Sequence, residues 1–338
     1  MHAYPALVCQ QPGTLTLENR SIDARKSGHA LVRPVRVGIC GTDYHIFEGK
    51  HPYLQYPRVM GHELAVEVID APDGSGLSTG DICAVNPYIS CGTCIACRQQ
   101  KPNCCTGISV LGVHADGGMA GLLEVPPGNL IPASGLTADQ CAAVEFLSIG
   151  AHAVRRGDVK SGDRVLVVGT GPIGLGAALF ARLSGGTVSV YDRDPERSQS
   201  ACQIIGVDAL SADEGFGAGV AAATNGDGFD VVFDATGNRA AMEAGFEAVA
   251  HCGRYVLVSV VKDPITFTDP DFHRKEMTLL GSRNATSVDF ERVIGAMREG
   301  EVPIDRLITH RTSLEGAVFD LPEWAQTKTG LIKALIEL

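Results

Sequence analysis

Two patterns of hydrophobic and polar positions divide the chain near residue 148. Before it, short runs that alternate apolar and polar residues are broken by glycine and proline, which is typical of strands joined by loops. The clearest strands are expected at residues 31–40, 64–70 and 81–87. Because no long amphipathic stretch interrupts these runs, we expect residues 1–148 to form a β-rich domain with long functional loops.

After residue 148, continuous apolar runs alternate with helical stretches. Residues 164–169 form an apolar run, as expected of a strand buried on both faces, and a helix is expected from Pro172 to about Ser184. Strands that alternate with helices predict an α/β fold with a parallel, doubly wound sheet over residues 149–283. Further strands are expected at residues 187–192, 230–236, 254–260, 278–282 and 330–338, and a second helix at 195–205.

The composition argues against a nucleic-acid-binding or membrane protein. The 338 residues are 45% hydrophobic and 20% charged, with a formal charge of -11 and no run of lysine or arginine, which argues against a nucleic-acid partner. No stretch of 18 apolar residues and no signal-peptide pattern appears, so we expect a cytoplasmic protein without a membrane partner. In that reducing compartment, clustered cysteines bind metal more often than they form disulfides.

Four of the 11 cysteines have the spacing C-x2-C-x2-C-x7-C. The short gaps let Cys91, Cys94, Cys97 and Cys105 turn their thiolates toward one centre, and four thiolates around Zn²⁺ leave no open position. We therefore expect a structural zinc site here. Iron–sulfur ligation and unrelated buried cysteines are the alternatives, and the spacing does not decide which of Cys104 and Cys105 faces away.

A G-x-G-x-x-G segment follows the first strand of the second region, opens a helix and precedes a strand that ends in Asp192. This context is the one that a dinucleotide-binding fingerprint requires, although a glycine-rich turn without cofactor is the alternative. Asp192 should bind the adenosine ribose and repel a 2′-phosphate, which favours NAD, while Arg193 weakens that preference. The residues expected at the pyrophosphate are Gly169, Gly171, Pro172, Ile173 and Gly174.

A thiolate, an imidazole and a carboxylate form a mixed ligand set with one position open for water or substrate. Cys40 and His62 follow or precede strands of the first region, and Glu145 lies just before the second region. Taken singly, each residue is more often structural than a ligand. The prediction of a catalytic zinc site therefore depends on the whole set.

The motifs GICGTDYHIFEG, VMGHE, the four-cysteine loop and GTGPIGL, in this order, are similar to those of the zinc-containing medium-chain dehydrogenases. The resemblance covers essentially the whole chain. It implies a GroES-like catalytic domain over 1–148 and a Rossmann NAD-binding domain over 149–283. It also implies that the segment 284–338 returns to the catalytic domain.

The resemblance also assigns roles to residues. It places the catalytic zinc on Cys40, His62 and Glu145, with Glu63 as the acid beside the site that competes with Glu145 for the third ligand position. Glu63 directly follows His62 at a strand start, so we expect its side chain to point the opposite way. Thr42 and His45 correspond to the proton relay, which starts at the reacting oxygen, and Thr236 flanks the nicotinamide.

Within the family, the chain resembles the polyol and sugar-acid branch, which implies a hexonate such as L-gulonate or L-galactonate as substrate. Candidate substrate contacts are Tyr53, His114 and Arg283, although His114 also suits a turn and Arg283 also suits the cofactor or Glu145. Gly118–Leu122 lacks the aromatic residue often found there, and Phe146 replaces a proline. Both departures affect the substrate pocket.

Together these features predict an enzyme with two zinc ions per chain that transfers a hydride from a secondary alcohol to NAD. The metal would lower the pKa of the substrate hydroxyl, and Thr42 would pass its proton toward His45. An L-threonine dehydrogenase-like activity and a non-catalytic zinc- and NAD-binding protein are the alternatives. We expect a homo-oligomer, either a dimer or a tetramer.

Overall fold

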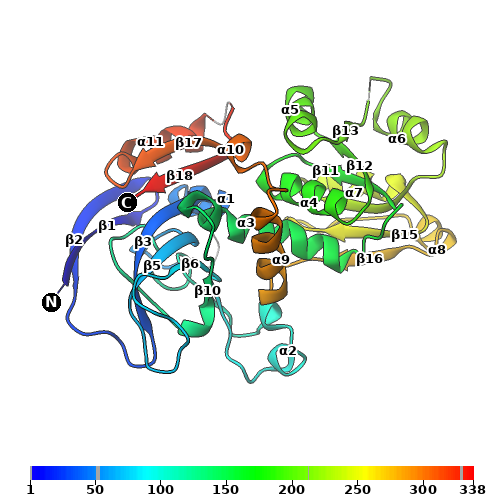
Figure 1. Ribbon diagram of the computed structural model, residues 1–338. Helices are drawn as coiled ribbons and strands as arrows, with labels where there is room; N and C mark the ends of the chain where they lie inside the picture. The colour runs from blue at the N-terminus through cyan, green and yellow to red at the C-terminus, as the bar shows by residue number, and fades with distance from the viewer. Residues whose placement is uncertain (1, 51–53, 212, 328–329) are drawn as a thin grey trace. The chain divides into compact units, whose positions relative to one another are not determined.

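The computed structural model describes residues 2–50, 54–211, 213–327 and 330–338. It divides into two compact units, one formed by Met1–Phe146 with Thr286–Leu338 and the other by Leu147–Ala285. Figure 1 labels the elements of both. Among the described helices, none combines the length and apolarity needed to cross a membrane.

The first unit is built mainly from antiparallel strands. A large sheet has the order β10-β6-β5-β3-β18-β17, with β9 also paired to β3, and smaller sheets have the orders β2-β1-β4 and β7-β8. The strands are β1 His2–Gln11, β2 Thr14–Ile22, β3 Ala30–Ile39, β4 Arg58–Val59, β5 Glu63–Asp70, β6 Ile82–Val85, β7 Tyr88–Ile89, β8 Ser109–Val110, β9 Leu123–Val125, β10 Leu130–Pro132, β17 Ile308–Ser313 and β18 Lys333–Glu337.

The C-terminal strand β18 lies inside this large sheet, between β3 and the edge strand β17. β18 pairs antiparallel with β3, with Ala334 opposite Ile39, and parallel with β17. Figure 1 shows β18 in red near β3 in blue. Residues from the last part of the chain therefore lie beside residues near position 40, which positions Lys333 at the site described below.

Helices also occur in this unit where the alternating pattern indicated only strands and loops. Helix α1 covers Gly41–Phe47, directly after β3, and α3 begins at Ala138, inside the region expected to lack a long helix. That expectation is wrong because α1 is short and because residues 141–147 of α3 are all buried and mostly apolar, which leaves little amphipathic contrast. The remaining helices are α2 Ile95–Arg98, η1 Pro102–Cys104, η2 Pro127–Asn129, α9 Ser287–Arg298, α10 Ile304–Leu307 and α11 Ala317–Gln326, and α3 ends at Arg156.

The second unit has a six-stranded sheet with the order β13-β12-β11-β14-β15-β16, and all of its pairs are parallel. The predicted α/β fold with a parallel, doubly wound sheet is confirmed. Its elements are β11 Arg164–Val168, α4 Pro172–Leu183, β12 Thr187–Tyr191, α5 Pro195–Ile205, β13 Asp208–Ala209, α6 Phe216–Thr224, β14 Phe229–Asp234, α7 Arg239–Gly245, η3 Phe246–Ala248, β15 Val249–Leu257, α8 Asp269–Arg274 and β16 Thr278–Gly281.

The turn between β11 and α4 requires its glycines. Gly169 has φ +91°, a backbone conformation that favours glycine. A Cβ on Gly174 would lie 1.8 Å from the carbonyl oxygen of Gly169, so only glycine allows the helix to begin this close to the strand. The sequence motif therefore produces a tight strand–turn–helix at the carboxyl end of β11, as predicted.

Candidate metal centres and cofactor pocket

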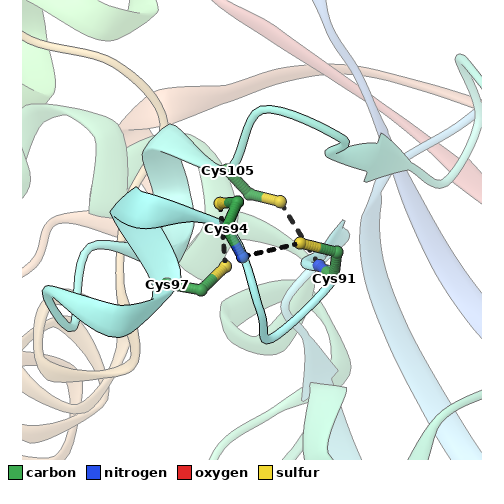
Figure 2. A group of neighbouring side chains, drawn as sticks. All are labelled: Cys91, Cys94, Cys97 and Cys105. Atoms are coloured by element: carbon green, nitrogen blue, oxygen red, sulfur yellow. Dashed lines mark hydrogen bonds between the residues drawn. The ribbon is translucent and has the colours of Figure 1, made fainter.

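Four cysteines converge in the loop that contains α2 and η1. The sulfur atoms of Cys91, Cys94, Cys97 and Cys105 all lie within 4.8 Å of one another, and Figure 2 shows them facing a common centre. Cys104 is exposed and outside the group, whereas Cys105 is buried within it. The structure thus distinguishes these two neighbours, which the spacing alone left open.

Backbone amides favour the thiolate form of part of this group. The Cys94 amide lies 3.4 Å from the sulfur of Cys91, and the Cys91 amide lies 3.3 Å from the sulfur of Cys105. Hydrogen bonds from the backbone at Cys97 and at Thr93 lower the pKa of Cys94 to about 5 and that of Cys91 to about 7. Sulfur donors in this arrangement fit a closed tetrahedral zinc site.

A second group contains three different donor types. One donor atom each from Cys40, His62 and Glu63 lies within 4.8 Å of the others. Cys40 precedes α1, so its thiol lies where β3 ends, and His62 is 5% exposed. Its Nδ1 has no hydrogen-bond partner among the described residues. A buried imidazole beside a thiol and a carboxylate fits a zinc site with an open position.

Asp43 orients this group. Its carboxylate is completely buried and accepts hydrogen bonds from the amides of Cys40 at 2.8 Å and Gly61 at 3.2 Å. Its Oδ1 lies 4.0 Å from Nδ1 of His62. Burial raises the pKa of Asp43, while His62 and the two amides oppose that shift. One side chain therefore links the segment before α1 to the segment before β5.

Glu63 forms a buried ion pair with Lys333 of β18. The Lys333 ammonium donates to both carboxylate oxygens at 2.7 and 2.8 Å, and the two side chains are 2% and 0% exposed. Burial disfavours the charged lysine, but Glu63, Cys40 and Glu145 together outweigh it and raise the pKa of Lys333. Gly38 provides the space, because a Cβ there would lie 2.1 Å from Oε2 of Glu63.

The expected opposite orientation of Glu63 is wrong. Side chains alternate only within a regular strand, and β5 begins at Glu63, so His62 lies outside it. Gly61 has φ +92°, which turns the backbone just before these residues. Both side chains therefore reach the same group, and the structure places Glu63, rather than Glu145, with Cys40 and His62.

Glu145 lies on α3 and is 4% exposed. Its carboxylate accepts a hydrogen bond from the hydroxyl of Tyr88. Burial raises the pKa of Glu145, and His62 is the strongest influence in the opposite direction, which indicates that the two side chains are close. The adjacent Phe146 ring lies 4.4 Å from the Lys333 ammonium, so the residue that departs from the family pattern packs on the lysine that binds Glu63.

The residues of the first unit that were predicted for the proton relay and for substrate binding lie in different surroundings. Thr42 is half-buried, with its hydroxyl 3.7 Å from the sulfur of Cys40, and His45 is exposed one turn later on α1. His114 accepts a hydrogen bond from the Val110 amide through Nδ1 at 3.1 Å, as a turn residue would. Tyr53 lies outside the described residues.

The second unit contains a cavity of about 660 Å³ at the carboxyl ends of its central strands. It includes five predicted cofactor residues, Gly169, Gly171, Asp192, Arg193 and Thr236. Pro172, Ile173 and Gly174 form the first turn of α4 directly after it, whereas Arg283 is exposed and does not line the cavity. The lining also contains Val168, Tyr191, Arg197, Phe216, Ala235, Asn238, Ala240, Ala241 and Ala244.

Asp192 is hydrogen-bonded to the glycine-rich turn. Its Oδ2 accepts hydrogen bonds from the amide and hydroxyl of Thr170 at 2.9 and 3.0 Å, and its Oδ1 accepts one from the Asp194 amide at 3.1 Å. On the other side of the cavity, Asp234 is fully buried and accepts hydrogen bonds from the amide and hydroxyl of Thr236. The Asp192 and Asp234 carboxylates therefore fix the backbone at Thr170 and Thr236, beside the cavity.

Several of these residues carried no role in the sequence interpretation. Lys333 had a recognisable signal, because it is a single charge inside the apolar run LIKALI. Asp43 lay inside a quoted motif without an assigned role, and Tyr88 had no distinguishing pattern. Arg197 lies within an expected helix, and only the fold brings its guanidinium near Gly171.

Comparisons with known proteins agree with this arrangement. Residues 26–135 match the alcohol dehydrogenase GroES-like domain, and residues 172–299 match the zinc-binding dehydrogenase family. The L-galactonate-5-dehydrogenase of Escherichia coli K12 is 42% identical over 313 residues, which cover 92% of each chain.

Two solved structures are similar over the whole chain. An NADH complex of an alcohol dehydrogenase (rspB) from Escherichia coli CFT073 has a TM-score of 0.91 and 27% identity, with 99% of each chain covered. The L-idonate 5-dehydrogenase of Escherichia coli K-12 has a TM-score of 0.91 and 26% identity, covering 100% of this chain and 99% of the other.

Proposed function

Because the chain belongs to the zinc-type medium-chain alcohol dehydrogenase family and is an NAD- and zinc-dependent dehydrogenase, we propose that it oxidises a secondary alcohol of a hexonate such as L-gulonate or L-galactonate. The observation that carries this proposal is the 42% identity over 92% of both chains with an L-galactonate-5-dehydrogenase. The mixed donor group supports the reaction type, since it presents a thiol, an imidazole and a carboxylate around one position.

Two zinc ions per chain are part of the proposal. Cys91, Cys94, Cys97 and Cys105 would hold a structural ion, because their sulfurs converge in a closed set. Cys40 and His62 would hold the catalytic ion. For the third protein ligand of the catalytic ion, the family resemblance favours Glu145, whereas the distances between donor atoms favour Glu63.

We assign the third position to Glu63 because its carboxylate lies with Cys40 and His62, whereas Glu145 is hydrogen-bonded to Tyr88. Glu145 then supplies a second carboxylate near the ion. Lys333 offsets part of the negative charge that two buried carboxylates and a thiolate bring together. This assignment reverses the roles that resemblance suggests for the two acids.

When bound, zinc supplies Lewis acidity to the alcohol oxygen, and NAD accepts the hydride. The residues of the chain orient the donors and move the proton. Thr42 and His45 are three positions apart on α1, so they share a face of the helix. Thr42, beside Cys40, would accept the proton of the substrate hydroxyl while it donates its own proton toward His45, and the exposed His45 imidazole would release a proton to solvent.

The cofactor assignment depends on the cavity of the second unit. Gly169, Gly171, Pro172, Ile173 and Gly174 would bind the pyrophosphate at the start of α4. Asp192 would bind the adenosine ribose, Arg193 would lie at its edge, and Thr236 would flank the nicotinamide half. Asp192→Ser should reduce the preference for NAD over NADP about tenfold, measured as the ratio of the two kcat/KM values. Arg193→Ser in that background should lower NADP use again.

We also propose the domain division 1–148, 149–283 and 284–338, with the last segment part of the catalytic domain. The pairing of β18 with β3 supports its final part. A cytoplasmic homo-oligomer completes the proposal.

The substrate is tested by comparing kcat/KM at saturating NAD for L-gulonate, L-galactonate, sorbitol, L-threonine and ethanol. A hexonate should give the highest value. A higher value for L-threonine or ethanol would reject the sugar-acid assignment and leave the zinc–NAD chemistry intact.

Arg283 is the candidate for the hexonate carboxylate. Arg283→Ala should reduce activity with the best hexonate far more than with sorbitol, because only the hexonate offers a carboxylate. Arg274→Ala, which removes an exposed arginine paired with Asp271 elsewhere in the second unit, is the matched control. An equal loss of activity with the hexonate and with sorbitol would show that Arg283 does not bind the substrate carboxylate.

A further inference from the structure

The mixed donor group has a spare acid beside it. Cys40, His62 and Glu63 each contribute one donor atom to the group, and Glu145 is not a member of it among the described residues. Burial raises the pKa of Glu145, while His62 lowers it and Glu63 raises it further, so these side chains are close. A tetrahedral zinc ion with four protein ligands has no position left for substrate. A second buried carboxylate so close is therefore a competitor for the position that the reaction needs.

The side chain that holds this acid is Tyr88. Its hydroxyl donates a hydrogen bond to Oε1 of Glu145, and Tyr88 is 9% exposed, so water has little access to replace the contact. Glu63 is held differently, because the Lys333 ammonium donates to both of its carboxylate oxygens. The two acids are thus restrained by separate donors, a cation for Glu63 and a neutral phenol for Glu145.

The phenol is presented from a backbone that is fixed independently of α3. Tyr88 belongs to β7, which pairs with β8 at the base of the four-cysteine loop, and it lies opposite Val110. The Tyr88 amide donates to Oδ1 of Asn86 at 3.1 Å, and the Tyr88 carbonyl oxygen accepts a hydrogen bond from Nδ2 of Asn129 at 3.2 Å. A turn of Glu145 toward the metal ligands would therefore break its bond to Tyr88 and leave a buried hydroxyl without its acceptor.

We propose that Tyr88 is a positioning residue, which holds the carboxylate of Glu145 out of the open position of the mixed group. This rests on the proposed function, because it requires a zinc ion on Cys40, His62 and Glu63. Loss of the hydrogen bond frees Glu145 to become a fourth protein ligand, which closes the site to substrate. The protein should then retain zinc more tightly while it turns over more slowly, a combination that loss of a purely structural tyrosine does not produce.

The test compares the wild type with Tyr88→Phe in two measurements that need no alcohol substrate. Retention of the catalytic zinc ion under a competing chelator should improve about tenfold, because a protein ligand is gained. Imidazole ligates a metal only where a position is open, so its dissociation constant should rise about tenfold, followed in the absorption spectrum of the cobalt(II)-loaded protein. The kcat/KM for the best alcohol should fall in parallel.

The rescue variant adds Glu145→Gln to Tyr88→Phe. Zinc sites use carboxylate rather than amide ligands, so zinc retention and imidazole affinity should return to within about twofold of wild type. Glu145→Gln alone should bind imidazole at least as tightly as the wild type does. Tyr255→Phe is the matched control, since Tyr255 is a fully buried tyrosine of the second unit whose hydroxyl donates to the carbonyl of Met242 at 2.9 Å. Its substitution should change neither measurement.

Weaker zinc retention in Tyr88→Phe, or imidazole binding equal to that of the wild type, would overturn the proposal. So would failure of Glu145→Gln to restore both values in the double variant, because the effect would then not act through Glu145. A protein that gives the expected values but oxidises no hexonate would retain this inference and lose the proposed substrate. A wild type that holds no zinc on Cys40 and His62 would overturn both.

Discussion

The two groups of candidate metal ligands in the first unit reach similar donor geometry by different routes. The four cysteines lie within one loop, with Cys91 and Cys105 only 14 positions apart, and several of them are partly exposed. The mixed group draws Cys40 from one segment and the adjacent residues His62 and Glu63 from another, and it adds Lys333, 270 positions after Glu63. Its His62, Glu63 and Lys333 side chains are buried, and Cys40 is half-buried.

This difference shows what each group needs from the rest of the molecule. A local loop with backbone amides directed at sulfur can favour thiolates by itself. A bound zinc ion would then supply the positive charge that balances them. A buried group must balance charge internally, because an unpaired carboxylate in the interior is costly. The mixed site therefore depends on the sheet that brings β3, β5 and β18 together.

The largest effect should come from removing a donor of the mixed group. His62→Ala should lower kcat at least about a thousandfold, because the ion that activates the alcohol is lost. The zinc content should fall from two ions per chain to one, with thermal unfolding little changed. Cys202→Ser, at a half-buried thiol outside both groups, is the control and should keep both ions. Full activity in His62→Ala would reject the mixed site as the reaction centre.

Lys333 tests the internal charge balance. Lys333→Met leaves the Glu63 carboxylate buried without its partner, so the free energy of unfolding should fall by about 3–5 kcal/mol. Chemical denaturation would measure it. Glu63→Gln in the same chain removes the stranded charge and should restore much of the stability. Additive losses in the double variant would show that the two side chains do not stabilise each other.

The two acids can be ranked by zinc retention under a competing chelator. Glu63→Ala should weaken binding of the catalytic ion more than Glu145→Ala, with the two variants about tenfold apart in apparent affinity. The reason is that Glu63 lies with Cys40 and His62, whereas Glu145 binds Tyr88. Tyr88→Phe removes only the hydroxyl bonded to Glu145 and serves as the control for that contact. The opposite ranking would return the ligand role to Glu145.

The smallest effect is expected at Cys104. Because Cys104 is exposed and outside the four-cysteine group, Cys104→Ser should change stability by less than about 0.5 kcal/mol and keep both zinc ions. Cys105→Ser, one position later, should lose the structural ion and lower the melting temperature. The pair differs by a single position, so zinc analysis and calorimetry of both variants locate the fourth ligand. Zinc loss in Cys104→Ser alone would exchange the two cysteines.

Local patterns predicted much of this molecule. The apolar runs located the parallel strands, and the glycine motif located the turn before α4, because a buried strand and a tight turn each impose a short-range requirement on the chain. Helix α1 was missed because seven residues are too few for a clear period. The orientation of Glu63 was missed because strand alternation does not extend past Gly61.

By itself, the sequence determined the family, the α/β fold class, the four-cysteine spacing and the ligand types, since these depend on residue identity and short separations. Only the tertiary structure decided that Cys105 rather than Cys104 joins the cysteine group, that Glu63 lies with Cys40 and His62, and that Lys333 neutralises it. These outcomes depend on strand pairing across most of the chain and on burial, which assign partners to charges that the sequence merely contains.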